Sequence, residues 1–196
     1  MTTATPITPK QVMTPERFAK GLTWEQYAGS IKANVERFKE FYDTFKPDPQ
    51  EVEFYKKFNE KKGGVKIVAI GADWCPDVVR GIPVVTRVAE AAGMDLRIFP
   101  KEENMDLMGE YLWRHQYESI PVFVFFDKDW KELGHFTEGP AARYKFMADL
   151  NEELSKQGLS DEDRTKVVRE RRAGVQMHWA TETVKEIREQ ILHRVM

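Results

Sequence analysis

Cysteine is almost absent from this sequence: Cys75 is the only one among its 196 residues. A single cysteine excludes an internal disulfide and fits a reducing compartment, so we expect a cytoplasmic protein. The four histidines are scattered, and no spacing typical of a zinc site occurs. We therefore expect neither a metal nor a bound cofactor.

Long hydrophobic runs and an excess of one charge are also missing. No run approaches the roughly 20 apolar residues that a membrane helix needs. The first ten residues lack the basic-then-apolar order of a secretory signal. The net charge is −2, which provides no general attraction to nucleic acid or to a lipid surface. We expect a soluble protein that binds neither.

The pattern of apolar residues divides the chain into three segments. Residues 1–50 are predicted to be a helical extension, residues 51–157 a domain of alternating strands and helices, and residues 158–196 a second helical extension. In the first segment, apolar side chains recur at helical spacing over residues 27–45, behind a capping box formed by Thr23 and Gln26. One helix is therefore predicted there, with its aromatic face in the core.

The middle segment alternates as α/β proteins do. Strands are predicted at residues 65–70 and 95–99, helices at 76–92, 103–116 and 143–154, and a β-hairpin at 120–126 and 132–136. In the third segment, Ser160 has N-cap character, and a narrow apolar stripe marks the last helix.

Cys75 lies where the first predicted strand gives way to a helix. Unpaired N–H groups and the positive end of the helix dipole favour a thiolate there, which would lower the cysteine pKa below about 8.5. Asp73 and Asp77 flank the cysteine and act in the opposite direction if they are close, whereas Arg80 lies one turn along and offsets them. The sign of the net shift stays open.

Four landmarks occur in order around this cysteine. They are the motif Trp74-Cys75-Pro76-Asp77-Val78, then Pro83, then Ile120-Pro121, and then Gly139. This pattern resembles the thioredoxin family over about residues 52–157. The resemblance implies an α/β fold with a central mixed sheet flanked by helices, to which this chain adds helices at both ends.

The resemblance also implies a substrate groove in which a cis-proline loop packs against the cysteine. Cys75 would be the nucleophile, and the groove would be lined by Trp74, Pro76, Asp77, Ile120 and Pro121. For Trp74, packing against the core is the favoured interpretation over substrate contact. Asp77 is interpreted as an acid of the first helical turn, with a general base as the lesser alternative.

Two departures from the family pattern bear on mechanism. Val78 occupies the position of the resolving cysteine, and Ala69 occupies that of the buried acid, so an ordinary dithiol cycle is excluded. The leading hypothesis is monothiol redox chemistry on a thiol or disulfide substrate, including a protein one, with an external thiol such as glutathione as co-substrate. The alternative is a non-catalytic thioredoxin-like module that binds a partner through the groove or the terminal helices.

Three further features, a basic segment, two histidines and the apolar stripes of the terminal helices, are not assigned to the site. The basic residues of 164–172 alternate with acids, which indicates a solvated helix face and no nucleic-acid site. His115 in a helix and His135 in a strand are expected to be surface or packed side chains. The narrow apolar stripes of the terminal helices suggest a homodimer.

Overall fold

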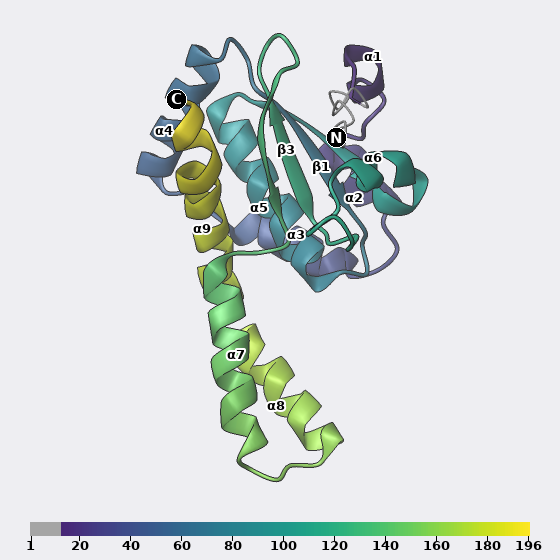
Figure 1. The fold of residues 1–196 in the computed structure, drawn as a ribbon, viewed down its shortest axis with the longest axis vertical. Coiled ribbons are helices and arrows are strands. Elements are labelled where there is room, and N and C mark those ends of the chain that lie inside the picture. The colour runs from purple at the N-terminus through teal and green to yellow at the C-terminus, as the bar shows by residue number, and fades with distance from the viewer. Residues whose placement is uncertain (1–12) are drawn as a thin grey trace, which may run out of the picture.

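The computed structural model describes residues 13–196. Residues 1–12, on which the prediction that there is no secretory signal rests, lie outside the described part. Helices surround a four-stranded sheet, and a hairpin of two helices, α7 (Ala141–Ser155) and α8 (Asp161–Ala173), extends away from the rest (Figure 1). The predicted α/β fold with helices added at both ends is confirmed.

The sheet is mixed and has the strand order β2-β1-β3-β4. Its strands are β1 (Lys66–Gly71), β2 (Asp95–Pro100), β3 (Val122–Phe126) and β4 (Glu132–Thr137). β1 pairs parallel with β2 and antiparallel with β3, and β3 pairs antiparallel with β4. The two central strands are buried almost throughout, which explains why they read as continuous apolar runs rather than alternating ones.

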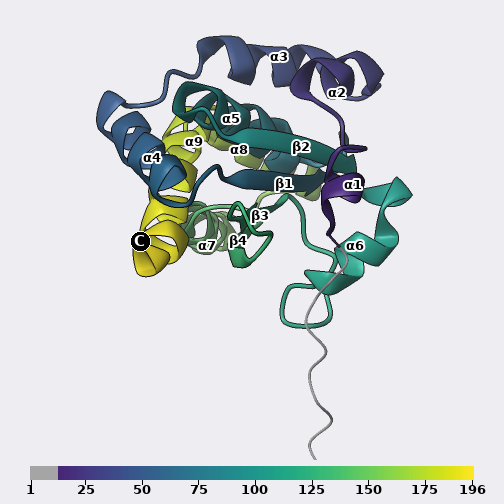
Figure 2. The same ribbon diagram turned by 90° about the horizontal axis from the view of Figure 1, so that it is seen from above.

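Helix α5 (Pro76–Ala92) follows β1 directly, with the bounds predicted from the sequence. It lies between the sheet and α3, as the view from above shows (Figure 2). Its first turns press closely on the end of β1. A Cβ atom on Gly71 would lie 2.7 Å from Val78 Cγ1, so the strand end has room only for glycine.

The single helix predicted over residues 27–45 is wrong. The capping box of Thr23 is present, but α2 (Trp24–Ser30) ends early and α3 (Val35–Thr44) begins after a break. In the break, the backbone N–H groups of Lys32 and Ala33 donate to Asp73 Oδ2, at 2.7 and 2.9 Å. The carboxylate of Asp73 thus accepts from two backbone N–H groups that would donate to helical carbonyls if the helix were continuous. The periodicity of apolar residues cannot predict this long-range contact.

The other helices vary in how well their bounds match the prediction. They are α1 (Pro15–Phe18), α4 (Pro49–Lys61), η1 (Lys101–Glu103), α6 (Met105–Glu110), α7 (Ala141–Ser155), α8 (Asp161–Ala173), α9 (Gln176–Ile187), the π-helical η2 (Arg188–Leu192) and η3 (His193–Val195). The helix predicted to reach residue 116 ends at α6, and His115 lies in a turn with a φ of 59°. Ser160 caps α8 as predicted.

The C-terminal helices differ sharply in burial. Val184, Ile187 and Leu192 of α9 and η2 are buried in the common core, and the Tyr55 hydroxyl donates to the Val184 carbonyl at 2.8 Å. By contrast, α8 has no buried residue. The chain therefore buries much of the C-terminal apolar stripe from which a homodimer was predicted. The homodimer stays a prediction, and so do the boundaries of the three segments.

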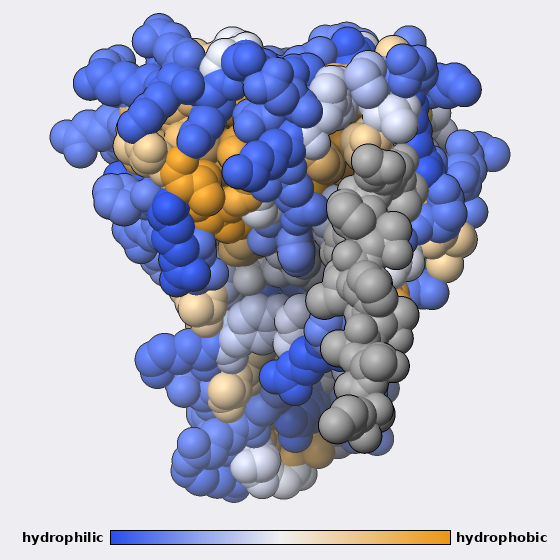
Figure 3. All heavy atoms as spheres, turned by 45° about the horizontal axis from the view of Figure 1, so that its top comes forward, coloured by the Kyte–Doolittle hydropathy of each residue, from blue (hydrophilic) through white to orange (hydrophobic). Residues whose placement is uncertain are grey.

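The surface is largely hydrophilic on the face drawn in Figure 3. A helix able to span a lipid bilayer, which must be long and apolar, is not found between residues 13 and 196. In the same part of the chain, no three His, Cys, Asp or Glu side chains gather as a metal site would require.

The burial of α9 predicts its contribution to stability. Ile187→Ala should lower the free energy of unfolding by about 2–5 kcal/mol, because it removes buried methyl groups and leaves a cavity. Urea denaturation followed by circular dichroism measures this change. Val167→Ala on α8 is the control and should change stability by less than about 1 kcal/mol. Equal losses in both variants would contradict the assignment of α9 to the core.

Candidate functional site at Cys75

Cys75 is the N-cap residue of α5, with extended backbone angles (φ −83°, ψ 121°). Its N–H donates to the Ala72 carbonyl at 3.1 Å, and its carbonyl accepts the first helical bond from Val79. Pro76 fits the next position because first-turn N–H groups have no helical partner. The side chain is half-buried, so the sulfur sits at the helix start, as the sequence predicts.

The pKa of the Cys75 thiol is raised, and burial is the main cause. The N–H groups of Val78 and Asp77 lower the pKa, and the nearby charges of Asp77 and Arg143 act in opposite directions. The sequence left the direction of the net pKa shift open, and in the structure the pKa is raised although the N–H groups of the helix start lower it, as expected. Withdrawal of the sulfur from water outweighs the favourable N–H groups.

The cis-proline loop lies directly against the cysteine. The Ile120–Pro121 peptide is cis, as the family resemblance implies. The Cys75 thiol donates to the Ile120 carbonyl, with 3.7 Å between sulfur and oxygen. Both loop residues are buried, and a Cβ atom on Gly81 would come within 3.1 Å of Pro121 Cγ. Glycine in α5 thus lets the loop approach the helix that carries the cysteine.

Trp74 is exposed, with 56% of its surface accessible. Its indole Nε1 donates to Glu102 Oε1 at 3.0 Å, and Lys101 Nζ lies 5.9 Å from the ring centroid. The preference for packing of Trp74 against the core is therefore wrong. The ring stands beside Cys75 with apolar surface available to a ligand.

Asp77 is buried and held by two arginines. Arg80 and Arg143 each place Nη2 2.7 Å from one of its carboxylate oxygens. Gly139 makes room for them, since a Cβ atom there would lie 3.1 Å from Arg143 Cδ and 3.2 Å from Arg80 Nη2. Because both oxygens accept from guanidinium groups, a general-base role for Asp77 has no support, and its place in a groove stays a prediction.

Arg80 is the most deeply buried charge of the site, with 1% of its surface exposed. Burial lowers the pKa of its guanidinium, while Asp77 raises it. Nη1 donates to Gln176 Oε1 at 3.0 Å, and the guanidinium carbon lies 5.4 Å from the centre of the Trp179 ring. Arg80 thereby joins the cysteine helix to α9. The only sequence signal for this role is a charge within the apolar stretch of residues 78–85.

Asp73, on the other side of the cysteine, anchors the N-terminal helices. Besides accepting from the break between α2 and α3, it accepts through its backbone carbonyl from Asn34 Nδ2 at 2.8 Å. The hydroxyl of buried Tyr27 finds no hydrogen-bond partner among the described residues. Burial, helped by the charges of Asp73 and Glu102, raises its pKa. The sequence analysis assigned Tyr27 only to the core, and it did not predict the hydrogen bonds between Asp73 and the N-terminal helices.

Residues 21–155 match the profile of a family described as thioredoxin. The chain belongs to the thioredoxin family. Its single cysteine stands at the first position of the family motif, with Val78 where the second would be. No curated protein matches the sequence.

Solved structures share the fold of this thioredoxin-like protein. A protein of unknown function from Pseudomonas aeruginosa is 18% identical, with a TM-score of 0.58, over 85% of this chain and 91% of that one. An HIV epitope-scaffold is 16% identical, with a TM-score of 0.58, over 87% and 94%. Thioredoxin of Fasciola hepatica is 26% identical over 42% and 75%, with a TM-score of 0.33. The first two similarities extend beyond the family segment and show the fold alone.

The buried ion pairs of Asp77 predict a large effect on stability. Asp77→Asn should cost about 3–5 kcal/mol, because it leaves the buried Arg80 without a counter-charge. Urea denaturation measures the loss. Asp149→Asn, which removes an exposed partner of Lys145, should change stability by no more than about 1 kcal/mol. Similar effects of the two substitutions would show that burial does not strengthen the Asp77 pairs.

Proposed function

We propose that this protein carries out thiol–disulfide exchange with Cys75 as its single nucleophile. The observation that carries the proposal is the position of Cys75 as the N-cap residue of α5, where the N–H groups of Asp77 and Val78 lower the pKa of the thiol without forming a cap hydrogen bond to it. Those groups stabilise negative charge on the sulfur, both when it attacks and when it leaves. The neighbouring Ile120–Pro121 loop supplies one wall, and exposed Trp74 supplies apolar surface beside it.

The reaction proceeds in two exchanges. Cys75 first loses its proton to water, and the thiolate attacks one sulfur of a substrate disulfide. A mixed disulfide forms, and the other half of the substrate leaves as a thiolate. An external thiolate, such as that of glutathione, then attacks the mixed disulfide, forms a new disulfide with the substrate half, and releases the Cys75 thiolate.

The external thiol is needed because the chain has no second cysteine. Val78 is fully buried against the end of β1 and offers only methyl groups. Ala69, in the strand before the motif, is equally buried and cannot transfer a proton. The protein should therefore reduce protein disulfides poorly without an added thiol.

A specific observation favours the second candidate, a non-catalytic binding module. The Cys75 thiol donates to the Ile120 carbonyl, an interaction that only the protonated form makes. Together with the raised pKa, this bond holds the sulfur in its less reactive state near neutral pH. In that case the surface around the exposed Trp74, where the family resemblance predicts a groove, would bind a partner without covalent chemistry.

The raised pKa predicts the pH dependence of reactivity. Because the thiolate is the reactive form, alkylation of Cys75 by iodoacetamide should be slow at neutral pH and should accelerate as the pH rises. The midpoint should lie above the free-cysteine value of about 8.5. Mass spectrometry after timed quenching gives the rate at each pH, and Cys75→Ser should show no labelling.

Exchange with glutathione disulfide separates the two candidates. Formation of a glutathione adduct on Cys75, followed by its release with reduced glutathione, would support monothiol exchange. A thiol that is alkylated at high pH yet never forms the adduct would contradict exchange and favour the binding module. The Cys75→Ser variant shows the background of both assays.

A further inference from the structure

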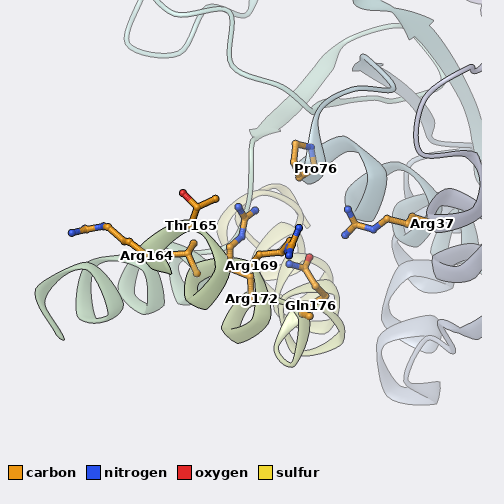
Figure 4. A pocket seen from close by; sticks show the side chains of 9 residues that line it. Arg37, Pro76, Arg164, Thr165, Arg169, Arg172 and Gln176 are labelled. Carbon is orange, nitrogen blue, oxygen red and sulfur yellow. The ribbon is translucent and has the colours of Figure 1, made fainter. Parts of the chain in front are cut away.

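A cavity of about 630 Å³ opens beside the start of α5. Figure 4 shows Pro76 on its wall, with Arg37 on one side and the arginines of α8 on the other. Pro76 lines the cavity and directly follows Cys75, the proposed nucleophile, which itself lies outside the lining. Its volume falls within the range of about 300–1,000 Å³ that is usual for small-molecule sites.

The cavity wall is strongly cationic. Four arginines line it, and none of the nine described lining residues carries a carboxylate. Arg164 donates to the neutral Asn151 amide at 3.1 Å. The other arginines of this wall, Arg37, Arg169 and Arg172, form no ion pair within residues 13–196. Gathering these unpaired charges costs electrostatic energy that a bound anion would offset.

Helix α8 presents this wall through one face. Thr165, Val168, Arg169 and Arg172 recur at helical spacing and line the cavity. Arg171 lies outside that lining and pairs instead with Glu153 of α7 at 3.1 Å. The predicted solvated face agrees with the absence of buried residues in α8, but the acids are not distributed evenly around the helix. Its cavity face lacks the compensating acids that its other face has.

We propose that this arginine-lined cavity binds the carboxylate groups of a small disulfide or thiol whose sulfur reaches Cys75. The proposal rests on the thiol–disulfide exchange proposed above and names its substrate class. Guanidinium groups bind carboxylates through paired, charge-assisted hydrogen bonds. In the exchange, the Cys75 thiolate displaces one half of the substrate as a thiolate, and the arginines hold the carboxylates of the half that stays bound.

The test compares two disulfides that differ by one carboxylate in each half, which in the second is masked as its ethyl ester. Glutathione disulfide carries all its carboxylates, whereas the disulfide of glutathione ethyl ester lacks one in each half. The wild-type protein should exchange with the first at least about tenfold faster at low substrate concentration, a factor that one charge-assisted hydrogen bond supplies. High salt should reduce this preference.

Matched arginine variants locate the effect. The double variant Arg169→Gln/Arg172→Gln should lose most of the preference for the free carboxylates. Arg171→Gln removes an arginine of the same helix that lies outside the cavity lining, and it should keep the wild-type preference. Circular dichroism establishes that all three proteins are folded. Equal rates for the two disulfides in the wild type, or an undiminished preference in the double variant, would overturn the carboxylate site.

A binding measurement keeps the two proposals separable. S-methylglutathione cannot exchange, so calorimetric titration of the intact protein reports the cavity alone. If no protein exchanges with either disulfide, the proposed function fails. Binding that is at least about tenfold weaker in the double variant than in wild type and Arg171→Gln would still support the carboxylate site. Equal binding in all three proteins, or none, would overturn it.

Discussion

The pairing of Asp77 with Arg80 and Arg143 is the interaction on which the arrangement around Cys75 depends. Asp77 lies in the first turn of α5 and pairs with Arg80 of the same helix and with Arg143 of α7. Arg80 also donates a hydrogen bond to Gln176 of α9. A buried charge without a partner costs several kcal/mol, so each member requires the others. One carboxylate thereby fixes the start of the cysteine helix against two elements of the C-terminal half.

The same carboxylate takes part in the balance of charge at the cysteine. Asp77 disfavours the thiolate, Arg143 favours it, and burial then decides the direction of the pKa shift. A helix start lowers a thiol pKa effectively when the sulfur is also solvated. Here the Ile120 carbonyl and the covering loop withdraw the sulfur from water. The site is thus built to hold a thiol that needs deprotonation before it can react.

The local elements of this fold could be predicted from the sequence because their signals are local. The bounds of α5 follow from Pro76 and the run of apolar residues, and the Thr23 capping box follows from the identity of two nearby side chains. The break before α3 could not be predicted, because it depends on a carboxylate about forty residues away. The exposure of Trp74 and the burial of Asp77 likewise depend on partners brought by η1 and α7.

The two acids beside the cysteine show why the added helices matter for the site. The sequence analysis predicted for Asp73 and Asp77 mainly an electrostatic effect on Cys75. In the structure, both carboxylates also bind other elements of the chain. Asp73 holds the junction of α2 and α3, and Asp77 holds the start of α7. The arginine-lined cavity is assembled from the next elements on each side, α3 and α8. Elements from both ends of the chain therefore meet at the motif, with α3 inside the segment that matches the family and α8 and α9 beyond it.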